Sequence, residues 1–114
     1  MLQTNLTHII TENDLQATLE ENDNVMVTCG RMGPMCIPVY DIMENLERKY
    51  QDVAFRDMAF DSAIADVVKG LPDARQLRSL PFVVYYKNGE VTKVTGGIQS
   101  KQQVKQNLDE LRQR

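Results

Sequence analysis

The sequence predicts an α/β domain in which a central mixed sheet carries helices on both faces. Two observations indicate this fold class. Helical and strand-like patterns alternate from residue 12 to residue 77, as in domains whose parallel strands are joined by helices. Two further strand-like segments follow, separated by Asn88-Gly89, which is the sequence signal of a hairpin and adds an antiparallel edge to the sheet.

Length and composition fit a single domain over residues 1–114. The chain is long enough to bury a core and too short for two domains, and its 42% hydrophobic and 25% charged residues are ordinary for a globular protein. The net charge of -3 includes no basic stripe, so we expect no nucleic-acid partner. The sequence shows no signal-peptide pattern and no segment of membrane-spanning length, so we expect a cytoplasmic monomer without membrane contact.

The first part of the chain predicts a helix followed by a buried strand. Thr11 and the acidic residues after it resemble a capping box, so a helix is expected from about residue 12 to residue 22. Val25-Met26-Val27 is a short apolar run between two turn signals, which is typical of a buried strand. Cys29 is expected at the carboxyl end of that strand.

A second helix and a second strand come next. Apolar residues recur every two to four positions from Ile37 to Tyr50, which indicates a helix with one buried face. Pro38 places the start of this helix near Cys36, because proline is tolerated in the first turn of a helix. Residues 53–60 then alternate as a strand does.

The remaining elements follow from turn and capping signals. A short helix is expected from residue 62 to about residue 70, and a further helical turn over residues 73–77. Residues 82–86 and 91–95 form the strands of the hairpin. Ser100 caps a final helix with one apolar face.

Cys29 and Cys36 are the only cysteines, and in a reducing compartment a close pair of thiols is typical of a redox or metal site. The loop between them contains two glycines and a proline, so it can turn back tightly enough for a disulfide, which needs α-carbons within about 7 Å. A thiolate at Cys36 would lie at the amino end of a helix, where free N–H groups favour negative charge, and Arg31 would add to this effect.

Three other interpretations of this loop remain open. Both cysteines are inert if they are simply buried. Cys29, Met32, Met35 and Cys36 offer two thiols and two thioethers, the soft ligand set that suits Cu(I). The third interpretation is an apolar surface that binds a partner. Its residues would be Met32, Met35, Ile37, Pro81 and Phe82.

The order of elements and three short motifs resemble the thioredoxin family over residues 8–111. The motifs are Gly33-Pro34 beside Cys36, Leu80-Pro81 directly before a strand, and the segment 86–90 that leads to Gly96-Gly97. The resemblance implies the thioredoxin fold, thiol-disulfide exchange with protein thiols and disulfides, no cofactor, and a thioredoxin reductase as a further partner. It also implies a cis peptide bond before Pro81, facing the cysteines. The partner-binding residues it implies are Leu80, Pro81, Met32, Gly33, Pro34, Met35 and Gly97.

The chain departs from the family at the active-site motif, because no Cys-Gly-Pro-Cys sequence is present. If the two Gly-Pro pairs are superposed, Met32 and Met35 replace both cysteines. If the helix sets the register, Cys36 takes the place of the resolving cysteine and Gly33 that of the nucleophile. Our leading interpretation is disulfide exchange in which Cys36 reacts first and Cys29 resolves; the alternative is a redox-silent binding or chaperone module.

Asp57 is the acidic residue that we expect to take part in this chemistry. Thioredoxins keep a buried carboxylate behind the resolving cysteine as a proton acceptor, and the matching position here is the apolar Met26. Asp57, on the neighbouring strand, is expected to replace it, partly buried behind Cys36. A plain ion pair of Asp57 with Arg56 or a lysine is the alternative, and His8 is expected to be solvated.

Overall fold

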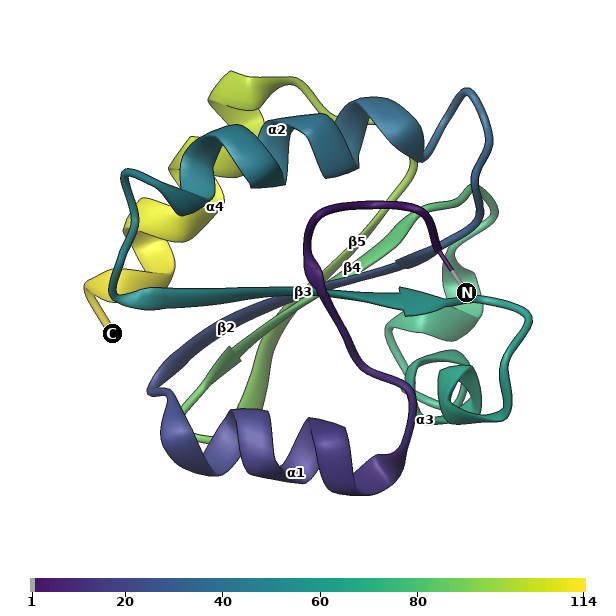
Figure 1. Ribbon diagram of the computed structural model, residues 1–114, viewed down its shortest axis with the longest axis horizontal. Coiled ribbons are helices and arrows are strands. Elements are labelled where there is room, and N and C mark those ends of the chain that lie inside the picture. Colours follow the sequence, from purple (N-terminus) through teal and green to yellow (C-terminus); the bar gives the residue numbers. More distant parts are fainter. Residues whose placement is uncertain (1) are drawn as a thin grey trace.

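The computed structural model describes residues 2–114 and contains a five-stranded sheet between two layers of helices (Figure 1). The strands, in chain order, are β1 (Thr7–His8), β2 (Asn24–Gly30), β3 (Val53–Ala59), β4 (Phe82–Lys87) and β5 (Glu90–Gly96). The helices are α1 (Glu12–Glu21), α2 (Ile37–Glu47), α3 (Asp66–Lys69) and α4 (Lys101–Arg112), with short 3-10 turns at Ala63–Ala65 and Ala74–Gln76.

The strands lie in the order β1-β3-β2-β4-β5, so β2 is central. β3 runs parallel to both β1 and β2, whereas β4 runs antiparallel to both β2 and β5. The predicted mixed sheet is therefore confirmed. The carboxyl ends of β1, β2 and β3 all lie at one edge of the sheet, and the loop that leads from β2 into α2 begins there (Figure 1).

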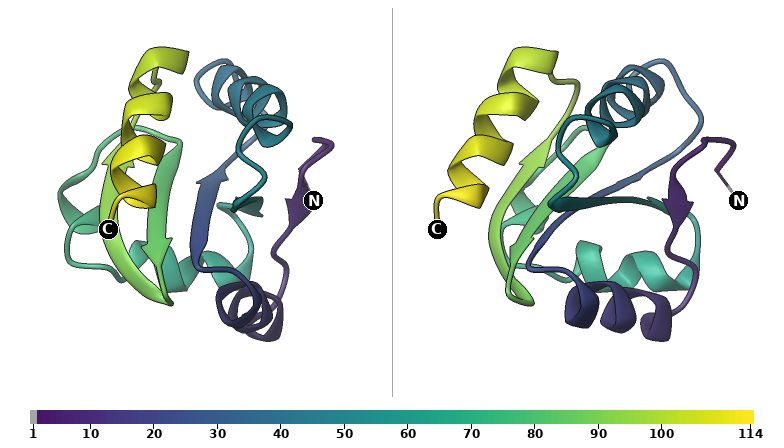
Figure 2. Two further views of the ribbon diagram at one scale, coloured as in Figure 1. Left: turned by 90° about the vertical axis from the view of Figure 1, so that its left-hand side faces the viewer. Right: turned by 60° about the vertical axis from the view of Figure 1, so that its left-hand side comes forward.

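Helices cover both faces of the sheet, and Figure 2 shows α2 and α4 on one side with α1 and α3 on the other. Two separate cores result, because successive side chains of a strand point to opposite faces. On β2, Val25, Val27 and Cys29 belong to the core under α1 and α3. Met26 belongs to the core under α2 and α4, and the Thr28 hydroxyl on the same face donates to the sulfur of Met43 in α2.

Most expected elements are present, with shifts of a few residues at their ends. The capping boxes at Thr11 and Ser100 are both formed, and Asn88 and Gly89 have the positive φ angles, 53° and 84°, that a tight hairpin turn needs. The second helix begins at Ile37 with Cys36 as its N-cap, as Pro38 indicated. The two-residue strand β1 was not predicted, because it is too short to show a pattern.

The N-terminal segment, residues 2–6, packs across the α2 side of β3. Leu2 and Leu6 enter the core under α2. The backbone N–H and side-chain amide of Asn5 both donate to the carboxylate of Glu44 on α2, at 3.4 and 3.1 Å. Among the helices formed by residues 2–114, none combines the length and apolarity needed to cross a membrane.

Candidate functional site

A groove lies where the β2–α2 loop faces the segment before β4. It is lined by Arg31, Gly33, Pro34, Met35, Cys36, Ser79 and Leu80, and its volume is about 320 Å³. Four of these residues, Gly33, Pro34, Met35 and Leu80, are among those that we expected to bind a partner. Ser79 was not expected, because nothing in its sequence surroundings marks it. The groove therefore brings together two segments that are more than forty residues apart in the chain.

Cys36 is held at the head of α2 by contacts from the loop that precedes it. Its backbone N–H donates to the carbonyl of Gly33 at 3.1 Å, which closes a turn, and its Sγ accepts a hydrogen bond from the Arg31 N–H at 3.5 Å. Although Cys36 lines the groove, only 3% of its surface is exposed. Its thiol is thus next to the groove but largely covered.

Pro81 follows Leu80, which lines the groove, and lies next to Gly30 at the end of β2. The Leu80–Pro81 peptide bond is cis. A Cβ atom added to Gly30 would lie 3.2 Å from Cβ of Pro81, so the two residues are in close contact. Gly97 does not line the groove; its N–H donates to the Pro81 carbonyl at 3.1 Å, and its φ of 89° is one that glycine adopts readily.

Cys29 is placed differently. It points into the core under α1 and α3 and is completely buried. Burial raises the pKa of its thiol to about 12, and the positive charge of Lys69 opposes this shift only in part. A thiol with so high a pKa remains protonated at neutral pH and is a poor nucleophile.

The structure does not bring Cys29 and Cys36 together, so the expected pair is not confirmed. Both thiols are free, and they belong to the two cores on opposite faces of the sheet. β2 itself lies between them, because alternation along that strand directs Cys29 away from α2. The same separation breaks up the Cu(I) ligand set that the sequence suggested, since Cys29 lies on the opposite face of the sheet from Cys36 and cannot join the loop methionines.

Asp57 is on the α2 face of β3, the same face as Cys36, and is completely buried. Its carboxylate accepts hydrogen bonds from the Thr4 hydroxyl and from Nδ1 of His8, the latter at 2.5 Å. Neither Arg56 nor a lysine pairs with it. The expectation of a solvated His8 was wrong, because β1 aligns His8 directly beside Asp57 in the parallel pairing of β1 with β3. Whether Asp57 serves Cys36 as a proton acceptor stays a prediction.

We expected the positive charge of Arg31 to act on Cys36, but the side chain of Arg31 points elsewhere. Its guanidinium makes two hydrogen bonds of 2.8 Å with the Asp61 carboxylate and lies over the Phe60 ring, 5.1 Å from its centre. This ion pair raises the pKa of Arg31 and lowers the pKa of Asp61. The backbone of Arg31, rather than its side chain, is what contacts the Cys36 sulfur.

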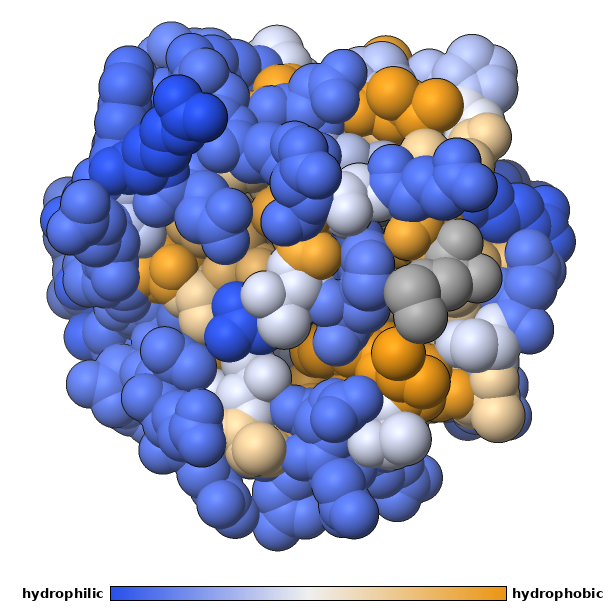
Figure 3. Space-filling view, in the orientation of Figure 1, coloured by the Kyte–Doolittle hydropathy of each residue, from blue (hydrophilic) through white to orange (hydrophobic). Residues whose placement is uncertain are grey.

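The loop and the start of α2 carry exposed apolar side chains, of which only Met35 lines the groove; the sulfur of Met32 accepts a hydrogen bond from the Gln3 N–H at 3.4 Å. Met32, Met35 and Ile37 are each about two-fifths exposed, although side chains of this kind are normally buried. In Figure 3 apolar surface is visible near the start of α2 and near the N-terminal segment, while much of the rest of that face is hydrophilic. Of the apolar surface expected from the sequence, Pro81 and Phe82 are buried and do not contribute.

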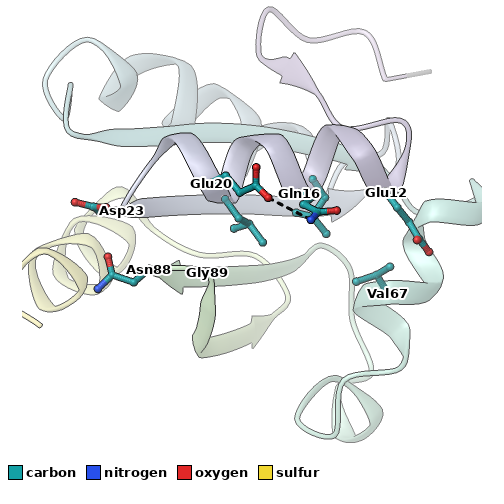
Figure 4. Close-up of a pocket in the computed structure, with 9 residues that line it drawn as sticks. Glu12, Gln16, Glu20, Asp23, Val67, Asn88 and Gly89 are labelled. Atoms are coloured by element: carbon teal, nitrogen blue, oxygen red, sulfur yellow. Dashed lines mark hydrogen bonds between the residues drawn. The ribbon is translucent and has the colours of Figure 1, made fainter.

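A second hollow lies along α1, on the face of the sheet opposite Cys36. Figure 4 shows the residues that line it, from α1, Val67 and the hairpin turn at Asn88 and Gly89. Its volume is about 700 Å³. Gln16 and Glu20, whose side chains are joined by a 3.2 Å hydrogen bond, lie along α1 there. None of the expected site residues lines this groove.

Tyr40 is the site residue that sequence reasoning missed. It is almost completely buried, one turn after Cys36 on α2, and its hydroxyl donates to the Arg31 carbonyl at 3.1 Å. A signal was present, because residues four positions apart on a helix lie on the same face. His8 offered no comparable signal, since its partner is on a distant strand.

The arrangement of helices and strands is that of solved thioredoxins. No model of a known protein family matches the sequence, and no curated protein matches it. Mitochondrial thioredoxin 3 from Saccharomyces cerevisiae, in its oxidised form, is 18% identical with a TM-score of 0.76, covering 93% of this chain and 95% of its own. Plasmodium falciparum thioredoxin is 19% identical with a TM-score of 0.75, covering 92% and 98%. A mutant thioredoxin from Halobacterium salinarum NRC-1 is 18% identical with a TM-score of 0.76, covering 97% and 96%. The chain therefore has the predicted thioredoxin fold.

The His8–Asp57 contact yields a first prediction. His8→Ala should lower the free energy of unfolding by about 2 to 3 kcal/mol, because a buried carboxylate loses one of its two partners. Urea denaturation measures this loss. The double variant His8→Ala/Asp57→Ala is the control: it should lose less than the sum of the two single variants, since no buried carboxylate remains. Strictly additive losses would show that the contact contributes nothing.

The raised pKa of Cys29 yields a second prediction, on alkaline stability. The thiol ionises near its ordinary value of 9.0 when the chain is unfolded and near 12 when it is folded. Its contribution to stability is therefore complete below pH 9 and is lost as the pH rises from 9 to 12, by at most about 1.4 kcal/mol per pH unit.

Urea denaturation on both sides of pH 9 tests this linkage. Cys29→Ala should reduce the slope of stability against pH above 9, while Tyr85 and Tyr86, whose pKa values burial also raises to about 12, continue to contribute to it. An unchanged slope in Cys29→Ala would mean that the thiol is not buried as described.

Proposed function

Starting from the thioredoxin fold, we propose that this protein binds an extended segment of a protein partner in the groove beside Cys36 and exchanges a disulfide with it. The observation that carries the proposal is the position of Cys36, which lines the groove at the amino end of α2 and has its Sγ against the Arg31 N–H. The positive end of the dipole of α2 lies there and favours a thiolate.

The exchange itself needs only one thiol from this chain. The Cys36 thiolate attacks one sulfur of a partner disulfide, and a new disulfide forms between Cys36 and that sulfur as the partner's bond breaks. The other partner sulfur leaves as a thiolate and takes up a proton from water. A second thiol, from the partner or from a low-molecular-weight thiol in solution, then attacks the mixed disulfide and releases Cys36.

Resolution by Cys29, our initial expectation, has less support than resolution by an outside thiol. Cys29 would have to leave the core under α1 and α3 and pass β2, the central strand of the sheet. An outside thiol needs only the groove to open. This chemistry suits a reducing compartment such as the cytoplasm, where both thiols stay reduced.

A redox-silent binding module is the second candidate function. The observation in its favour is the small exposed fraction of Cys36, 3%, which limits access to the sulfur. Met35 in the groove and the exposed Met32 in the same loop would still give a partner apolar contacts. The two candidates differ in one respect that can be measured, namely whether Cys36 forms a covalent bond with a bound peptide.

A peptide disulfide provides this measurement. The probe is an extended peptide with one cysteine, activated as a mixed disulfide with an aromatic thiol whose release is followed by absorbance. Wild type and Cys29→Ala should each release one equivalent and gain the mass of the peptide at Cys36. Cys36→Ser should release none. Binding of the peptide to wild type without any mass gain would favour the redox-silent module, and a mass gain at Cys29 would overturn the role proposed for Cys36.

Met35, the exposed apolar side chain that lines the groove, yields a separate prediction on the rate of exchange. Met35→Gln should slow the reaction with the peptide disulfide by about tenfold, the effect of losing about 1.4 kcal/mol of apolar contact. The reaction with a small aromatic disulfide should keep its rate, because that reagent is too short to contact Met35. Val91→Thr, an exposed apolar position on β5, is the matched control. Equal slowing of both reagents would mean that Met35 acts on Cys36 itself.

A further inference from the structure

The hydroxyl of Tyr40 lies inside the site, where the proposed reaction has no role for it. Tyr40 is 1% exposed, and its ring is fixed in the core under α2. Its hydroxyl bonds to the Arg31 carbonyl at 3.1 Å, and Cys36 Sγ accepts from the N–H of the same residue at 3.5 Å. The side chains of Tyr40 and Cys36 thus bond to the backbone carbonyl and the backbone N–H of the same residue, Arg31.

The Tyr40 hydroxyl and the Cys36 sulfur both lie close to Gly30. A Cβ atom at Gly30 would lie 2.7 Å from the hydroxyl oxygen and 2.8 Å from Sγ, closer than atoms normally approach. Both groups therefore occupy the space that a side chain at position 30 would fill. β2 ends in a glycine here, and the hydroxyl and the sulfur both lie over its backbone.

The geometry points to Tyr40 as a positioning residue for the exchange proposed above, on which this inference rests: its hydroxyl donates a hydrogen bond to the Cys36 sulfur when that sulfur is a thiolate. The thiol proton leaves to solvent, and Tyr40 keeps its own proton and turns it from the Arg31 carbonyl toward Sγ. With the Arg31 N–H, the thiolate then has two donors. Hydrogen bonds to a charged acceptor are roughly twice as strong as neutral ones.

Tyr40 is suited to this role because it keeps its proton well above the pH at which a free tyrosine ionises. Burial, followed by the negative charge that Cys36 can carry, raises the pKa of Tyr40 far above its ordinary value. The negative charge that Asp57 can carry adds to the same shift. A tyrosine that keeps its proton is a donor under all conditions in which a thiolate needs one.

The test is the titration of Cys36 in the intact protein, followed by NMR of its labelled β-carbon, which responds to loss of the thiol proton without requiring reagent access. In Tyr40→Phe the midpoint of this titration should move up by about one pH unit, which corresponds to tenfold less thiolate below the midpoint, because one charge-assisted hydrogen bond is lost. An unchanged or lower midpoint in a folded Tyr40→Phe protein overturns the inference.

Tyr85→Phe is the matched control. Tyr85 is buried in the same core, and its hydroxyl pairs with Asn107 of α4 rather than with Cys36. Removing it deletes an equally buried hydroxyl, so the Cys36 midpoint should stay at the wild-type value. A shift as large as that of Tyr40→Phe would mean that any loss of packing in this core moves the titration, and would overturn the specific role.

A second variant covers the case in which Tyr40→Phe does not fold. Tyr40→3-fluorotyrosine keeps the hydroxyl and nearly the same shape but makes the hydroxyl a stronger donor, so the midpoint of Cys36 should move down. No change or an upward move overturns the inference. The titration is independent of any partner: if the peptide exchange fails and the midpoint still responds to Tyr40, the proposed function fails while the contact holds.

Discussion

The alternation of side chains along β2 is the constraint on which the rest of the site depends. β2 is the central strand and is covered on both faces, so every one of its residues is buried and each must belong to one core or the other. Cys29 goes to the core under α1, and Gly30 follows it at the edge of the sheet. A shift of the strand by one residue would exchange these roles and remove the space that Cys36 and Tyr40 occupy.

That constraint also separates two kinds of thiol chemistry. A sulfur enclosed by aliphatic side chains, like that of Cys29, is part of the packing and has no route to solvent. A sulfur at a helix terminus, like that of Cys36, has polar neighbours and a groove beside it. The two cysteines are near each other in sequence, yet the sheet assigns them to different environments. Distance along the chain is a poor guide to pairing when a central strand lies between the residues.

Much of the fold could be predicted from the sequence, because its signals are local. The capping residues Thr11 and Ser100, the Asn88-Gly89 turn and Pro38 each determine backbone geometry within a few residues of themselves. The sequence signal for β2 covers only Val25–Val27 of the strand Asn24–Gly30, since a strand buried on both faces shows no alternation. The site was harder to predict, because its contacts join residues that are far apart in the chain. His8 beside Asp57 depends on the register of two parallel strands, which no local pattern specifies.

The two methionines of the β2–α2 loop make the groove sensitive to oxidants. Met32 and Met35 present exposed thioethers, and thioethers take up oxygen to become sulfoxides under oxidising conditions. The change replaces a flexible apolar side chain with a polar, chiral one at the positions where a partner would meet apolar surface. An oxidant would therefore alter which segments the groove accepts while Cys29, enclosed in its core, stays untouched.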